Sequence, residues 1–113
     1  MSVALEKADA FREDFARQAL WYVREAGEEV ARSFQKAVDT TLQLLCAQPE
    51  LGRVRRFRHP KLQDLRSFRL VHPFHRRLIF YRWNGGTLQA IRLMHGARDL
   101  PRRLAEPTDS GTV

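Results

Sequence analysis

Four side chains in the C-terminal half of the chain are of the types that act on a phosphodiester. Arginines hold a phosphate and stabilise the charge that develops on it, and a histidine titrates in the range in which a general base works. The four residues are Arg66, Arg82, Arg92 and His95. No tyrosine or second histidine follows His95, and a single histidine at a strand end is more often a structural hydrogen-bonding residue. The pattern leaves a nuclease site open without establishing one.

Other kinds of chemistry find little support in the composition. Cys46 is the single cysteine and lies in an apolar helical pattern, so we expect it in the core and no disulfide within the chain. His59, His72 and His75 share no spacing that is typical of a metal site. We therefore expect neither a metal nor an organic cofactor.

The charge of the chain is divided unevenly. Residues 1–50 hold 6 Lys and Arg against 9 Asp and Glu, whereas residues 51–113 hold 14 against 4. Such a basic half favours a polyanion or a strongly acidic protein as partner. The charge is densest in a basic loop that consists of Arg53, Arg55, Arg56, Arg58 and Lys61. A solvated loop without a binding role is the alternative explanation for this run.

The residues before the basic loop show helical periodicity. Apolar residues recur at a spacing of three to four over residues 9–26, and a second helix follows Gly27 and stops at Pro49. The short connection predicts an antiparallel hairpin of helices over residues 9–47. A brief apolar stretch at residues 3–5 would add an edge strand before it.

The pattern changes to that of strands near residue 60. Residues 78–81 and 90–94 are apolar on both alternating faces, and Asn84-Gly85-Gly86 between them favours a hairpin turn. We predict an α+β fold in which the helical hairpin packs on one face of a small antiparallel sheet built from residues 65–94. Residues 1–105 would form a single domain, with a last turn or helix over 97–105 and a disordered tail over 106–113.

This order of elements resembles the RelE/ParE superfamily of toxins from type II toxin–antitoxin modules. The similar segments are AxxFQKAVDTTLQLL followed by QPELGR, then LRSFRL, LIFYR and IRLMHGARDL, and together they span roughly residues 3–104. The sequences of the segments LIFYR and HGARD are closer to those of ParE-like than of RelE-like members.

The resemblance implies a toxin that a co-encoded antitoxin neutralises. It implies DNA gyrase as the target if the chain is ParE-like, and ribosome-bound mRNA, cleaved by an endoribonuclease, if it is RelE-like. A third possibility is a repurposed member that only binds its antitoxin and, through that complex, operator DNA.

The double-sided apolar strands point to a partner independently of the resemblance. One helical hairpin covers one face of the sheet, which leaves the other face for an acidic, partly disordered antitoxin, or for residues 97–105 folded back over it. The residues expected to contact the antitoxin or the target are Arg69, Phe80, Arg82, Trp83, Arg92, Met94, His95 and Arg98. We further expect Arg82 and Arg92 to share a face with Phe80 and Ala90.

The sequence predicts a cytoplasmic protein. No apolar run approaches the roughly 20 residues of a membrane-spanning helix, and the N-terminal residues lack the apolar stretch of a secretory signal.

Overall fold

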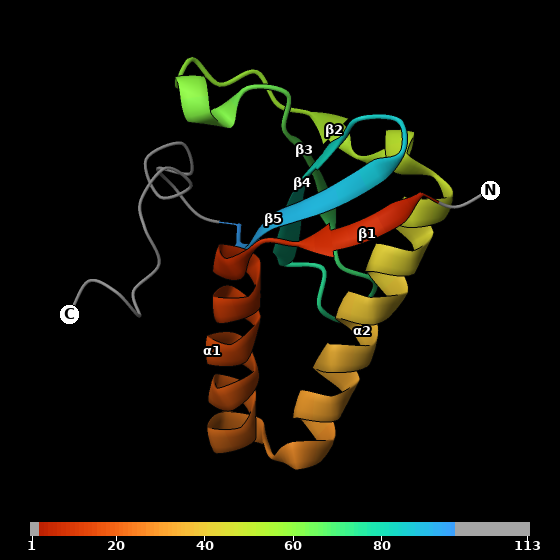
Figure 1. The fold of residues 1–113 in the computed structure, drawn as a ribbon. Helices are drawn as coiled ribbons and strands as arrows, with labels where there is room; N and C mark the ends of the chain where they lie inside the picture. The colour runs from red at the N-terminus through yellow and green to blue at the C-terminus, as the bar shows by residue number, and fades with distance from the viewer. Residues whose placement is uncertain (1–2, 97–113) are drawn as a thin grey trace.

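A computed structural model describes residues 3–96 of the chain, apart from the side chain of Lys61. Two helices lie against one face of a twisted five-stranded sheet (Figure 1). The elements are β1 (Ala4–Lys7), α1 (Asp9–Ala26), α2 (Glu28–Ala47), β2 (Arg53–Val54), β3 (Arg66–Arg69), β4 (Arg77–Trp83) and β5 (Thr87–His95), with short 3-10 turns at Pro49–Leu51 and Pro60–Leu62. The predicted α+β fold is confirmed, and the expected features at 97–105 and 106–113 lie outside the described residues.

The order of strands across the sheet is β1-β5-β4-β3-β2. All neighbouring pairs are antiparallel except β1 and β5, which are parallel. The predicted edge strand at the N-terminus is thus present as β1. Residues 53–54, which we expected to belong to a loop, instead form the short strand β2 and pair with β3.

A β-bulge interrupts the pairing of the two central strands. Phe80 pairs with Arg92 but the next residue, Tyr81, pairs with Ala90, so that Ile91 is an extra residue on β5. Because one extra residue reverses the alternation of side chains, Ala90 belongs to the core beneath the helices and Phe80 to a cluster on the other face. The expectation that Phe80 and Ala90 share a face is therefore wrong.

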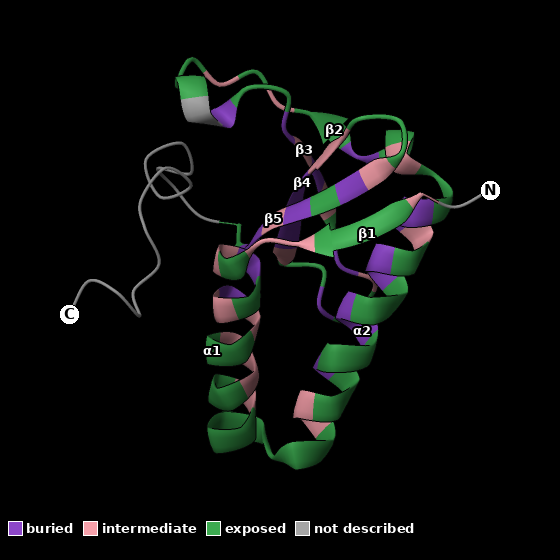
Figure 2. Ribbon diagram, in the orientation of Figure 1, coloured by how far each residue is buried: buried purple, intermediate pink, exposed green. Residues whose placement is uncertain are grey.

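The helical hairpin turns on a single residue. Gly27 has φ of 98°, a conformation that side chains disfavour, and its N–H caps α1 by bonding to the carbonyls of Tyr22 and Val23. Phe34 of α2 is fully buried, and its ring lies 5.6 Å from that of Phe15 and 4.8 Å from that of Tyr22. The far end of the hairpin extends beyond the sheet and is exposed (Figure 2). No helix within residues 3–96 is long and apolar enough to cross a membrane.

The face of the sheet opposite the helices has a small core of its own. Phe80 is completely buried there, together with Leu78 and Met94 of the central strands. The side chains packed with them from the connection between β2 and β3 are Phe57, Leu62 and Leu65. The prediction that this face is left uncovered by the chain is wrong, because the segment that contains the basic loop supplies apolar side chains that cover it.

Tyr81 joins the end of the helical layer to the sheet. Its side chain is fully buried, and its hydroxyl donates to the carbonyl of Pro49 at 2.6 Å and accepts from the N–H of Gly52 at 2.8 Å. Gly52 is required here because a Cβ at this position would collide with the Tyr81 ring and hydroxyl. Burial raises the pKa of Tyr81 above the ordinary tyrosine value.

We predict that Tyr81→Phe lowers the free energy of unfolding by about 1–3 kcal/mol, because it leaves the N–H of Gly52 without its acceptor. Urea denaturation at pH 7 measures this. Since the raised pKa favours the protonated phenol in the folded state, the wild type should lose stability as the pH rises above about 10. The Phe variant should lose less stability than the wild type over the same range, and an identical loss would contradict this role for Tyr81.

Candidate functional site

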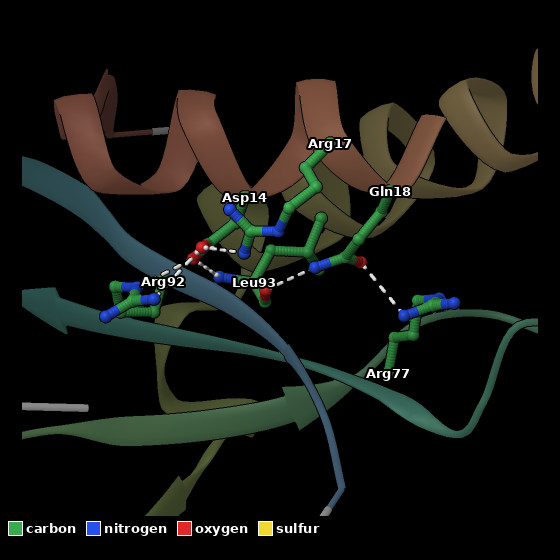
Figure 3. A network of polar contacts seen from close by, with 6 residues as sticks. All are labelled: Asp14, Arg17, Gln18, Arg77, Arg92 and Leu93. Atoms are coloured by element: carbon green, nitrogen blue, oxygen red, sulfur yellow. Dashed lines mark hydrogen bonds and ion pairs between the residues drawn. The ribbon is translucent and has the colours of Figure 1, made fainter. Parts of the chain in front are cut away.

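The most extensive polar network in the described structure is centred on Asp14 of α1 (Figure 3). Its carboxylate is completely buried and accepts two bonds from the guanidinium of Arg92, at 2.7 Å from Nε and 3.0 Å from Nη2. The backbone N–H of Leu93 donates to the same carboxylate at 3.0 Å, and Arg17 adds a further bond at 3.0 Å from the solvent side. The acceptor oxygens of a buried carboxylate are thus well supplied with donors.

The network exists because α1 takes over the edge of β5 where β1 ends. β1 pairs with β5 as far as Ala90, and the N–H of Ala8 still bonds to the carbonyl of Ala90. Beyond that point side chains of α1 replace a neighbouring strand. Asp14 accepts the N–H of Leu93, and Gln18 donates to the carbonyl of Leu93 at 2.7 Å. Both backbone groups of Leu93 are therefore satisfied inside the protein.

A second arginine of the sheet is directed to the helices as well. Arg77 donates to the hydroxyl of Tyr22 and to the side-chain oxygen of Gln18, each at 3.1 Å. Its guanidinium lies 5.1 Å from the centre of the Tyr22 ring and 5.6 Å from that of Phe34. Arg77 and Arg92 thus connect the two layers of the fold.

The sequence pattern alone does not single out Asp14 or Gln18 as functional residues. Both occupy the stripe of α1 that contains the buried Phe11, since they lie three and seven residues after it. Asp14 is a charged residue on the apolar face of α1, and Arg92 is a charged residue inside an apolar strand. Two such residues of opposite charge together predict a buried ion pair.

We predict that Asp14→Ala destabilises the protein by about 3–5 kcal/mol, because it leaves the Arg92 guanidinium buried and unpaired. The double variant Asp14→Leu with Arg92→Met should recover much of this loss, since neither charge then remains in the interior. Thermal and urea unfolding of the two variants measure the difference. A double variant no more stable than Asp14→Ala would contradict a mainly electrostatic cause.

The four residues considered for phosphodiester chemistry do not converge. Arg92 is buried against Asp14, and Arg66 donates to the backbone carbonyls of Glu50 and Gly52 at 3.2 and 3.0 Å. Arg82 donates to the carbonyl of Gln63 at 2.9 Å. His95 pairs with Arg77 at the opposite end of β4, five residues from Arg82, which is about 17 Å along a strand. The structure thus places the one imidazole of this set far from Arg82.

The residues expected to contact a partner have diverse surroundings. Phe80 and Met94 are buried in the cluster on the face opposite the helices, whereas Arg69 and His95 are exposed. Trp83 is half-buried and pairs with Leu88 across the hairpin, and its Nε1 is buried without a hydrogen-bond partner among the described residues. Arg98 lies outside the described residues.

The arginines that the structure does bring together are Arg53 of β2, Arg55 directly after it and Arg69 of β3. Arg53 is directly opposite Ser67, and Arg55 donates from Nε to the Ser67 hydroxyl at 2.7 Å. Arg69 follows Ser67 by two residues and so lies on the same face of β3. Within residues 3–96, no group of three or more His, Cys, Asp or Glu side chains is arranged to hold a metal ion.

Comparison with solved structures defines the class of the fold. The chromosomal ParDE toxin–antitoxin system from P. aeruginosa is 18% identical with a TM-score of 0.66, and the alignment covers 83% of this chain and 96% of that one. The intact RelBE toxin–antitoxin complex from E. coli is 13% identical with a TM-score of 0.51, covering 86% and 100%. At such identities the likeness concerns the fold alone, which is that of ParE/RelE toxins.

The sequence itself identifies the family. The model of the ParE toxin of type II toxin–antitoxin systems, parDE, matches residues 5–100. No curated protein sequence matches the chain. The chain belongs to the ParE toxin family, and it is a type II toxin of the ParE/RelE superfamily.

Proposed function

We propose that this toxin inhibits DNA gyrase and that a co-encoded antitoxin neutralises it. The observation on which the proposal rests is the match to the parDE family model over residues 5–100. The alternative, a ribosome-dependent mRNA endoribonuclease, has less support because it needs a general base close to the phosphate-binding cations.

The positions of the candidate catalytic groups support this preference. An arginine binds phosphate and stabilises negative charge, but it cannot accept the proton of a 2′-hydroxyl at neutral pH. His95 is the candidate base, and it lies at the other end of β4 from Arg82. Arg92 would be a second cation of the site, but its guanidinium forms an ion pair with Asp14. An inhibitor that acts by binding a protein needs no such convergence.

We predict that His95→Ala remains toxic and continues to inhibit DNA supercoiling by purified gyrase. His95 is exposed and lies at the end of β5, so its loss should change stability little. A supercoiling assay with relaxed plasmid, run beside a translation assay that detects mRNA cleavage, measures both activities of the wild type and the variant.

The same two assays identify the alternative. For a nuclease that uses His95 as its base, mRNA cleavage and toxicity would fall together by about 100- to 10,000-fold in the variant. Cleavage of ribosome-bound mRNA by the wild type that disappears in His95→Ala would therefore contradict the proposal.

The neutralising partner that we propose is an acidic antitoxin that is partly disordered before it binds. The solved neighbours are described as a ParDE system and a RelBE toxin–antitoxin complex. The excess of basic residues over 51–113 would attract such a chain over long range. Exposed apolar side chains at the far end of α1, which are Leu20, Trp21 and Val23, offer surface on which a disordered segment could become ordered. Contact with operator DNA would then come through the complex.

We predict that the product of the adjacent reading frame co-purifies with this protein at low salt. The association rate should fall as the salt concentration rises from 50 to 500 mM, because exposed charges are then screened. Surface plasmon resonance at a series of salt concentrations measures this rate. An association rate independent of salt would contradict electrostatic attraction, and a failure to bind would contradict the choice of partner.

A further inference from the structure

Three arginines gather around Ser67 on the face of the sheet opposite the helices. Ser67 pairs with Arg53 on one side and with Phe80 on the other, and Phe80 belongs to the cluster on that face. The guanidinium of Arg55 bonds to the Ser67 hydroxyl and lies 5.8 Å from the centre of the Phe80 ring. Arg69 lies two residues beyond Ser67, about 6.6 Å along the strand. We call Arg53, Arg55 and Arg69 the arginine triad.

The triad is a concentration of positive charge without internal neutralisation. Within residues 3–96, no carboxylate forms an ion pair with any of its three members. Burial, and after it the positive charges of Arg53 and Arg69, lower the pKa of Arg55 below the ordinary arginine value. Arg53 and Arg69 are thus each close enough to repel the charge of Arg55, and a bound anion would relieve this repulsion.

The orientation of Arg55 is fixed before any ligand arrives. Its guanidinium is held by Ser67 and Phe80, and its backbone N–H bonds to the carbonyl of Leu65 at 2.8 Å. Arg69 donates to the carbonyl of His75 at 3.1 Å, which leaves further N–H groups on its guanidinium for an anion. Fixing donors in advance lowers the entropic cost of binding.

The surroundings of the triad favour a nucleic-acid backbone over an acidic peptide. Protein interfaces depend on apolar anchors, but Leu65 and Phe80 beside the triad are fully buried, and the exposed Val54 lies on the opposite face of β2 from Arg53. The exposed cations Arg56 and Arg58 continue the charge from Arg55 along the segment that projects beyond the sheet (Figure 1). A row of cations of this kind matches a ligand with a negative charge on every unit, and phosphate contacts dominate the affinity of nucleic-acid binding.

We propose that the arginine triad binds the phosphodiester backbone of a nucleic acid. Among the described residues, the side chains of the triad donate to one hydroxyl and one backbone carbonyl, and none of them contacts a carboxylate or an imidazole, so we infer binding of the backbone and not its cleavage. This role would be additional to gyrase inhibition and antitoxin binding.

The test compares two double variants of the purified full-length protein. Arg53→Gln with Arg69→Gln removes two exposed members of the triad and keeps Arg55 in place. Arg24→Gln with Arg32→Gln removes the same charge from exposed positions of α1 and α2. Fluorescence anisotropy measures the binding of labelled 12-nucleotide single-stranded RNA and DNA over a range of salt concentrations. Circular dichroism checks the fold, and Arg53→Gln alone, which removes no side-chain hydrogen bond among the described contacts, serves if the triad variant unfolds.

We expect the triad variant to bind at least tenfold more weakly, and the slope of log K against log salt to become shallower by about 1.4, which is about 0.7 for each lost phosphate contact. The control variant should change affinity less than threefold. If the triad variant loses affinity for both RNA and DNA, the site binds the backbone that the two share. If it loses affinity for only one of them, that nucleic acid is the ligand. Equal losses in the two double variants, no loss in either, or displacement of the oligonucleotide by an equal concentration of a 12-residue polyglutamate peptide would overturn the proposal.

Discussion

The buried carboxylate of Asp14 is the interaction on which the two-layer structure depends. It joins α1 to the edge of β5 that β1 leaves open, by accepting bonds from Arg92 and from the backbone N–H of Leu93. A charge in the interior is tolerated only when its donors are complete, so this site fixes both the position of α1 and the register of β5 beside it. The bulge at Ile91 lies next to this contact, where β5 changes its partner from β1 to α1.

The arginines of the sheet therefore have two different roles. The guanidinium groups of Arg77 and Arg92 bind side chains of α1. Arg66 donates to backbone carbonyls of the turn that follows α2. Arg53 and Arg69 are exposed on β2 and β3. A basic composition alone does not distinguish arginines that stabilise the fold from arginines that remain available to a ligand, and only the latter contribute to binding.

The two sides of the molecule also present different kinds of surface. The segment between β2 and β3 covers the face opposite the helices with Phe57, Leu62 and Leu65, and it presents its charges outward. That face is consequently polar and basic at its surface although it is apolar beneath. Leu20, Trp21 and Val23 are exposed at the far end of α1, and Leu5, Leu51 and Val54 are exposed elsewhere in the described structure. The far end of α1 thus offers an apolar partner segment a surface away from the basic face.

The sequence by itself determined the helical hairpin, the central strands, the turn at residues 84–86 and the family, because each depends on local periodicity or on short segments in a fixed order. It did not determine the faces of the strands, since a bulge of one residue at Ile91 reverses the alternation and has no reliable local signature. It did not determine the fate of Arg92 either, whose partner Asp14 is 78 residues away in the chain. Only the tertiary structure decided which arginines are buried and which gather around Ser67, because pairing between distant elements, and not residue type, sets the surroundings of a charge.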